Sequence, residues 1–187
     1  MITNSESMIK TMTSSNEAFH AIDHEFSYCI RPIDKDDKNK LIELFNHLSP
    51  ESRYLRFAHA ISKLPDKFLE DVLELDYQKE MAFIAITKNI GGDEEIIGIA
   101  RYISDASENT CEFSISVSDQ YTTYGVGMNL MKQLINHARR NDLKKMIGYI
   151  LTSNTKMLIM TRELGFEVNS SMNEPEFKIA TLNLHKK

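Results

Sequence analysis

The chain has 187 residues, of which 42% are hydrophobic and 26% are charged, and its formal net charge at pH 7 is −5. This length and composition are typical of one globular domain with its own core. The negative charge argues against nucleic acid or an anionic membrane as the main partner, because both repel an acidic protein. Charged residues interrupt the apolar runs before the ~20 residues that a membrane helix needs, and we expect a cytoplasmic protein.

The cysteines and histidines indicate neither a disulfide framework nor a metal site. Cys29 and Cys111 lie in segments that alternate in the manner of strands, where isolated cysteines are by default buried reduced thiols. The six histidines show no HExxH motif and no Cys/His ligand spacing, so no metal is expected. Residues 1–25 lack the basic start and apolar core of a secretory signal. We expect an N-terminal tail there and a single domain over residues 26–187.

The first half of this domain is predicted to contain one strand and three helices. Asp34 and Ser49 each precede an apolar stretch of helical period, and Pro50 suits the first turn of the second helix. The predicted elements are a strand over residues 26–33 and helices over residues 35–47, 50–57 and 66–75.

In the second half the period changes from helix to strand and back. The clearest alternation lies in residues 110–118, where Cys111 and Phe113 alternate with Glu112 and Ser114. Strands are predicted over residues 81–87, 96–103, 110–118, 145–151, 166–168 and 177–184, and helices over residues 125–141 and, capped by Ser153, up to Leu164. This order predicts an α/β (α+β) fold with a mixed sheet, without the regular alternation of a Rossmann fold.

The junction between strand and helix at Gln120–Gly127 carries the main functional signal. Gly125 and Gly127 let the backbone approach a ligand closely, and the amides at a helix start bind anions. A tight structural turn would also use glycines here. A Rossmann fingerprint is excluded because Leu130 stands at its third glycine, and the Gly-Lys-Ser/Thr of a P-loop is missing.

This junction resembles the cofactor loop of GNAT acetyltransferases, in which Gln/Arg-x-x-Gly-x-Gly/Ala holds the pyrophosphate of CoA. The matching residues are 122–127, and Asn154 and Leu164-Gly165-Phe166 match a later block of the family. The resemblance covers roughly residues 28–184. It implies a GNAT fold with a mostly antiparallel central sheet flanked by helices, and acetyl-CoA as co-substrate without a metal.

A closer resemblance is to the acetyltransferase domain of Pat-type bacterial protein lysine acetyltransferases. It rests on the stretches Ile30–Ile33, Leu48–Phe57, Asp76-Tyr77, Glu80–Ala82 and Cys111–Ile115. The resemblance implies a protein lysine as the acceptor and Glu112 as the catalytic glutamate. A homodimer is left open.

The resemblance also assigns binding residues. The expected cofactor-binding residues are Val117, Ser118, Thr122, Thr123, Tyr124, Gly125, Val126, Gly127, Met128 and Asn154. Ser52, Arg53, Tyr54 and Arg56 lie on the helix that walls the acceptor side in this fold. Two departures stand out: Thr122 replaces the usual Gln or Arg, which removes a side chain directed to phosphate, and Thr161 stands where many members have a tyrosine as general acid.

Transfer of an acetyl group to an amine requires an uncharged amine. A lysine has a pKa near ~10.4, so a base must take its proton at neutral pH. Glu112, on the polar face of its strand, is the candidate base, and a backbone amide near Val117 would polarise the thioester carbonyl. Cys111 points to the opposite face, which disfavours an acyl-enzyme.

Two other functions remain open at this stage. The acceptor could be a small amine such as a polyamine or an aminoglycoside, which the negative net charge would suit. Alternatively, the departures at Thr122 and Thr161 could mark a CoA-binding module without catalysis.

Overall fold

An eight-stranded sheet organises the part of the chain that the computed structural model describes, which is residues 18–21, 26–88, 91–105 and 107–185. The strands lie in the order β1-β2-β3-β4-β5-β6-β8-β7. They are β1 (Ala18–Ala21), β2 (Ser27–Pro32), β3 (Glu80–Lys88), β4 (Glu94–Asp105), β5 (Thr110–Val117), β6 (Lys145–Leu151), β7 (Glu167–Ser170) and β8 (Phe177–Asn183). The helices are α2 (Lys38–His47), α3 (Pro50–Phe57), α4 (Asp66–Leu73), α5 (Val126–Arg140) and α6 (Thr155–Glu163), with short 3-10 turns η1 (Lys35–Asp37) and η2 (Asp119–Tyr121).

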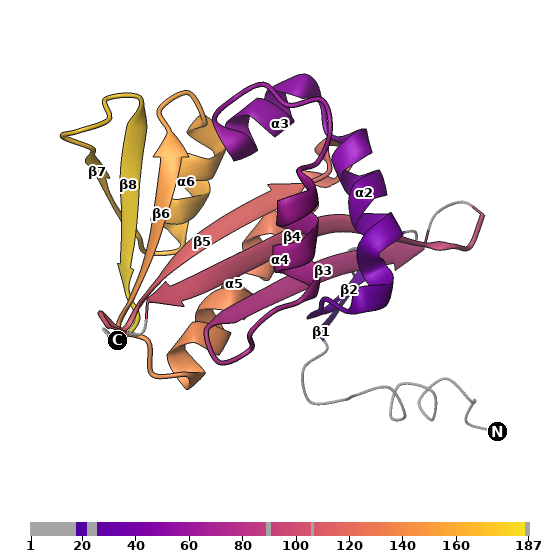
Figure 1. The fold of residues 1–187 in the computed structure, drawn as a ribbon, viewed down its shortest axis with the longest axis horizontal. Coiled ribbons are helices and arrows are strands. Elements are labelled where there is room, and N and C mark those ends of the chain that lie inside the picture. The colour runs from indigo at the N-terminus through magenta and orange to yellow at the C-terminus, as the bar shows by residue number, and fades with distance from the viewer. Residues whose placement is uncertain (1–17, 22–25, 89–90, 106, 186–187) are drawn as a thin grey trace.

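Neighbouring strands are antiparallel except for β5 and β6, which are parallel. The parallel pairing covers only three residue pairs, from Thr110 with Lys145 to Glu112 with Ile147. Both strands continue beyond this point, and they diverge in a V whose open end faces α3 (Figure 1). The mixed, mostly antiparallel sheet predicted from the sequence is thus confirmed, and its one parallel pair opens a gap.

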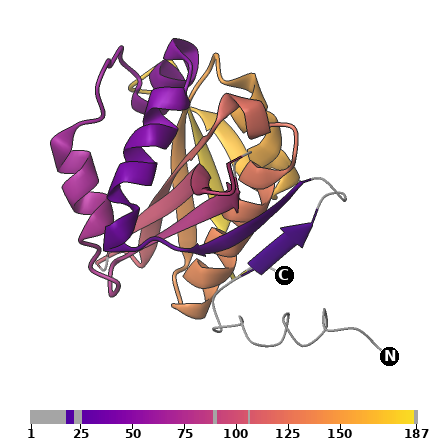
Figure 2. The ribbon, with the colours of Figure 1, turned by 90° about the vertical axis from the view of Figure 1, so that its right-hand side faces the viewer.

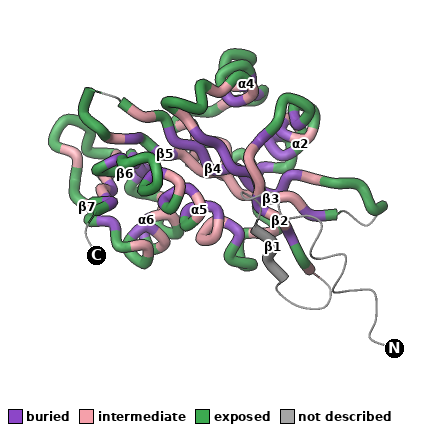
Figure 3. The backbone as a smooth tube through the Cα atoms, turned by 90° about the horizontal axis from the view of Figure 1, so that it is seen from below, coloured by how far each residue is buried: buried purple, intermediate pink, exposed green. Residues whose placement is uncertain are grey.

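Helices cover both faces of the sheet (Figure 2). On one face, α5 packs through Leu130, Met131 and Leu134, all of which are buried in the larger core. On the other face, α2 and α4 form a second core. The buried stretches of backbone run along the central strands, between these two helical layers (Figure 3). Burial of this much apolar surface is what holds the layers together.

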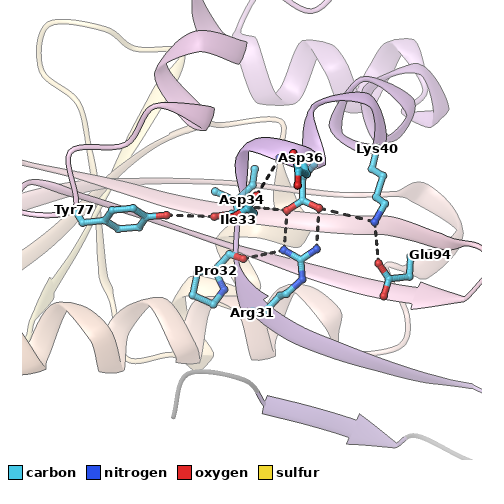
Figure 4. A network of polar contacts seen from close by, with 9 residues as sticks. Arg31, Pro32, Ile33, Asp34, Asp36, Lys40, Tyr77 and Glu94 are labelled. Carbon is cyan, nitrogen blue, oxygen red and sulfur yellow. Dashed lines mark hydrogen bonds and ion pairs between the residues drawn. The ribbon is translucent and has the colours of Figure 1, made fainter. Parts of the chain in front are cut away.

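Ion pairs fix the start of α2 on the sheet (Figure 4). Asp37 is buried, and its carboxylate accepts hydrogen bonds of 2.7 and 2.8 Å from the Arg31 guanidinium and of 2.8 Å from the Asp34 amide. Lys40 reaches across to Glu94 on β4 at 2.8 Å. Because α3 begins three residues after the end of α2, this network also sets where α3 starts.

The helices and strands predicted from residue 26 onward are all present, with ends shifted by a few residues. Two expectations are corrected. Asn154, not Ser153, caps α6, because its side-chain oxygen accepts a 3.1 Å hydrogen bond from the Met157 amide. Residues 18–21, which fall in the expected tail, form β1 and pair with β2. The rest of residues 1–25 lies outside the described residues.

Candidate active site

A cavity of about 630 Å³ lies at the open end of the V between β5 and β6. Residues from α3, the end of β5, the loop that follows, the start of α5 and α6 line it. Nine residues that the sequence assigns to the site lie together in its wall: Ser52, Arg56, Val117, Thr122, Thr123, Gly125, Gly127, Met128 and Asn154. A second cavity of about 580 Å³, lined by residues of α2, α4 and the segments beside them, contains none of the predicted site residues.

The end of β5 offers a backbone donor to this cavity. The Ser118 amide donates a 2.9 Å hydrogen bond to the Ile97 carbonyl of β4. Successive amides of a strand point to opposite edges. The Val117 amide therefore points toward the side where β6 has separated, and Val117 lines the cavity. An N–H in this place can stabilise negative charge on a carbonyl oxygen.

The start of α5 presents further amides to the cavity. Gly125 takes a left-handed conformation with φ of 73° and stands at the N-cap, where no side chain caps the helix. The Asn129 amide makes the first helical bond, to the Gly125 carbonyl at 3.0 Å. The preceding amides of the first turn lack partners within the helix, and together with the helix dipole they form a site for phosphate.

Five residues predicted to contact the cofactor take other positions or have other roles. Ser118 and Val126 are buried and outside the cavity wall, and Tyr124 packs on Phe26 with 4.6 Å between ring centroids. Asn154 lines the cavity while its side chain caps α6. The Thr122 hydroxyl donates to the Asp119 carbonyl at 3.2 Å, so it closes its own turn.

A carboxylate joins the two walls of the cavity. Asp119 accepts hydrogen bonds from the Ser52 hydroxyl at 2.6 Å, the Ser49 amide at 2.8 Å and the Ser49 hydroxyl at 3.2 Å. Partial burial raises the pKa of Asp119, but these hydrogen bonds outweigh burial and hold the pKa below its usual value. Ser52 therefore acts in positioning α3, and Asp119 is a cavity residue that the sequence reading missed.

Arg56 lies in the cavity wall, whereas Glu112 lies outside it on β5. Arg56 lines the cavity, and its Nη2 donates a 3.0 Å hydrogen bond to the Ser114 hydroxyl. Burial lowers the pKa of Arg56 to about 10; the charge of Arg101 acts in the same direction, whereas the charge of Glu112 opposes it. Glu112 is exposed, shares a face of β5 with Ser114, and is not part of the cavity wall.

The other two residues predicted to contact the acceptor are turned away. Arg53 donates a 3.0 Å hydrogen bond to the Asn46 carbonyl, and its guanidinium lies 4.5 Å from the centroid of the Phe45 ring. Tyr54 is 45% exposed and lies outside the cavity wall. Helical spacing explains this, because only one face of α3 meets the cavity.

Another wall of the cavity is formed by α6. From this part of the chain, the sequence predicted only Asn154 as a site residue. Met157 and Met160, one turn apart, line the cavity together with Lys156. Residues three apart in a helix share one face, so their spacing could have predicted that both line the same cavity. Thr161 is fully buried, and its hydroxyl donates to the Leu158 carbonyl at 3.1 Å, so it does not reach the cavity.

Cys111 is buried on the opposite face of β5, and burial raises the pKa of its thiol to about 12. A thiol in this state is a poor nucleophile. In the described ranges, no three His, Cys, Asp or Glu side chains are grouped so that they could hold a metal ion. None of the helices described there has the length and apolar character needed to cross a membrane.

Comparison with known proteins agrees with this geometry. A family model for the acetyltransferase (GNAT) domain matches residues 28–167. Acetyltransferase PA5475 of Pseudomonas aeruginosa is 34% identical over 137 residues, which is 73% of each chain. The L-methionine sulfoximine/L-methionine sulfone acetyltransferase of Pseudomonas aeruginosa is 32% identical over 82 residues, which is 42% of this chain and 48% of that protein.

Solved structures share the fold. The GNAT domain of S. lividans PAT superposes with a TM-score of 0.79 at 23% identity, over 89% of this chain and 96% of that one. The acetyltransferase yncA of Salmonella typhimurium, described as putative and solved with acetyl-CoA, gives a TM-score of 0.63 at 21% identity, over 84% and 94% of the chains. The match to the family model and the identity to PA5475 show that the chain belongs to the GNAT acetyltransferases, enzymes that use acetyl-CoA.

Proposed function

We propose that this enzyme acetylates a primary amine, with acetyl-CoA in the cavity between β5 and α6 and Glu112 as general base. The observation that supports this most is the meeting of a strand edge and a helix start in one cavity. The volume of about 630 Å³ lies in the range of small-molecule sites. The second cavity, beside α2 and α4, contains none of the residues predicted for the cofactor.

The chain offers a distinct contact for each part of the co-substrate. The amides at the start of α5, near Gly127 and Met128, would hold the pyrophosphate. The edge of β5 beyond Glu112, which β6 no longer pairs, would receive the amides of the pantetheine arm. The Val117 amide would face the thioester carbonyl.

The proposed step is a direct attack by the amine. A bond forms between the amine nitrogen and the acetyl carbon, the bond from that carbon to sulfur breaks, and the CoA thiolate leaves. Glu112 receives the proton of the amine. Because Glu112 lies outside the cavity wall, we propose that a water relays this proton. The buried Cys111 thiol, with its pKa of about 12, has no part in this route.

We propose a protein lysine as the acceptor, as the resemblance to Pat-type enzymes implies. The likeness to the GNAT domain of S. lividans PAT supports this choice. The sheet face around Glu112 also supports it. Ile103, paired with Glu112 across the sheet, is 48% exposed, and Tyr149, on the same face of β6, is 50% exposed. An open face with exposed apolar side chains suits a protein surface.

A small amine is the second candidate. It is favoured by the partial likeness to a protein named for acetylating L-methionine sulfoximine and L-methionine sulfone, which are small molecules. The polyamine and aminoglycoside alternatives rest only on the net charge of −5.

Glu112→Gln tests the base. Thiol release from acetyl-CoA is measured with a pool of lysine peptides for wild type, Glu112→Gln and the control Glu108→Gln, which changes an exposed glutamate of the β4–β5 turn. We expect kcat of Glu112→Gln to fall about 10²- to 10⁴-fold near neutral pH, and part of the loss to recover at a pH where the amine is already uncharged. Full turnover in Glu112→Gln would overturn the base assignment. Binding of acetyl-CoA without turnover on any acceptor would favour a module without catalysis.

A further inference from the structure

We infer that Arg56 binds a carboxylate that the acceptor carries close to its amine. This inference rests on the proposed function, because it takes the acceptor to enter beside Glu112. It names the chemical class of acceptor, which the family and the cavity leave open.

The guanidinium of Arg56 is held in a fixed place on the cavity wall. Its Cζ lies 4.9 Å from the centroid of the Phe57 ring and 5.5 Å from that of the Phe68 ring, and its Nη2 donates to the Ser114 hydroxyl at 3.0 Å. A guanidinium packed on two rings is held in a fixed orientation, with its N–H donors in the plane of the group. Arg56 lines the cavity, so a ligand in this space lies beside its side chain.

Arg56 lacks a carboxylate partner of the kind that Arg31 and Arg101 have. Arg53 also has none among the described residues, but it lies outside the cavity wall. Arg31 pairs with Asp37, and Arg101 pairs with Glu80. Within the described residues, Arg56 takes part in none of the ion pairs, and the Ser114 hydroxyl is its one hydrogen-bond acceptor. One of the five N–H groups of this guanidinium is thus used within the described residues. A carboxylate is the group that fits this fork with two parallel hydrogen bonds.

The spacing along β5 limits how far this carboxylate lies from the amine. Arg56 contacts Ser114, and Glu112 lies two residues away on the same face of the strand. Two residues of a strand span roughly 7 Å. An acceptor that places its amine toward Glu112 and a carboxylate on Arg56 therefore has the two groups a few bonds apart or on neighbouring residues.

The charge of Glu112 acts on Arg56, but the two side chains form none of the ion pairs among the described residues. The other carboxylates around the cavity do not pair with Arg56 either. Glu51 and Glu163 are exposed, and water screens their charges. Asp119 is occupied by Ser49 and Ser52. A polyamine or an aminoglycoside would bring a second positive charge toward the Arg56 guanidinium, which is repulsive. The structure therefore favours an acceptor with an anionic group over a polycation.

Two sources could supply this carboxylate, a free amino acid or an acidic residue beside a lysine in a protein. Matched pairs separate them: L-amino acids against their C-terminal amides, and lysine peptides with glutamate against glutamine next to the lysine. We measure kcat/KM for both members of each pair with wild type, Arg56→Gln, Arg56→Lys and the control Arg53→Gln. Arg53 lies one turn before Arg56 on the same helix, outside the cavity wall.

We expect wild type to prefer the carboxylate member of one kind of pair by about 10- to 100-fold, mainly through KM. The ratio of kcat/KM for the carboxylate member to kcat/KM for the neutral member should approach one in Arg56→Gln. It should take an intermediate value in Arg56→Lys and keep its wild-type value in Arg53→Gln. A preference confined to amino acids identifies the free amino acid as the source, and one confined to peptides identifies the acidic residue.

A wild-type ratio of one overturns the inference without any variant, which matters if Arg56→Gln folds poorly. An unchanged ratio in Arg56→Gln and Arg56→Lys overturns it as well. In both cases, the proposed function still holds if acetyl transfer to an acceptor depends on Glu112. The absence of transfer to any acceptor would instead overturn the proposed function.

Discussion

The hydroxyl of Ser52 donates a 2.6 Å hydrogen bond to the carboxylate of Asp119, although the two residues are 67 positions apart in the sequence. Ser52 belongs to α3, and Asp119 begins η2, in the loop between β5 and α5. The same carboxylate also accepts a 2.8 Å hydrogen bond from the Ser49 amide. One side chain thus joins α3 to the loop between β5 and α5, two segments that line the same cavity.

Asp119→Ala should lower the free energy of unfolding by about 1 kcal/mol, since it removes hydrogen bonds to a charged but partly exposed group. The folded-state pKa of Asp119 lies below its usual value. The stabilisation is therefore present above the unfolded pKa of ~3.9 and is lost as pH falls through the folded pKa. Urea unfolding at several pH values tests this. Asp71→Ala, which removes only an exposed pair with Lys67, is the control. Equal effects of both variants near pH 7 would contradict the role of Asp119.

Two glycines of the loop should respond differently to alanine. Gly125 has φ of 73°, so Gly125→Ala should destabilise by about 1–2 kcal/mol. A Cβ at Gly127 would lie 3.5 Å from Met160 Sδ and from Val117 Cγ2, which is ordinary contact. Gly127→Ala should therefore be neutral or stabilise by up to about 1 kcal/mol, as expected inside a helix. Denaturant midpoints in the reverse order would show that the loop has another conformation.

Cys111→Ala should retain turnover. With a pKa of about 12, only roughly one in 10⁴ of the Cys111 thiols is ionised at pH 8. Mass spectrometry of the enzyme incubated with acetyl-CoA should show no acetyl group on this residue. Loss of turnover in a folded Cys111→Ala, together with an acetylated Cys111 in wild type, would establish an acyl-enzyme route.

Local signals made most of the fold predictable. The change of period at residues 110–118 and the glycines that follow located β5, the loop and the start of α5. The four-residue edge strand β1 was missed, because its pairing with β2 depends on the folded sheet. The site was predicted less completely. The contribution of α6 through Met157 and Met160, and the position of Glu112 outside the cavity wall, follow from how β5 and β6 diverge. The point at which two strands separate depends on how they pair in the folded sheet, so the sequence of one strand does not predict it.

Stability should decrease in mild acid because of His137. Its Nδ1 lies 2.9 Å from the Tyr102 hydroxyl, and its ring packs edge-on against Phe83. Burial lowers the pKa of His137, and the nearby charge of Arg140 lowers it further. The unfolded chain then binds a proton first, so stability is lost as pH falls below ~6.5, by at most about 1.4 kcal/mol per pH unit. His137→Gln should have a flatter dependence between pH 5 and 7 in urea unfolding. If the free energy of unfolding changed with pH equally in wild type and His137→Gln, groups other than His137 would be responsible for the pH dependence.

Titration of acetyl-CoA by calorimetry tests most directly that the co-substrate binds in the cavity between β5 and α6. Thr123→Glu adds a negative charge to an exposed residue of the cavity wall, and Asn136→Glu adds the same charge to an exposed residue of α5 outside that wall. We expect one acetyl-CoA per chain, binding weakened about tenfold or more in Thr123→Glu by repulsion of the phosphates, and wild-type affinity in Asn136→Glu. No binding to wild type, or equal affinity in all three proteins, would contradict this location of the cofactor site.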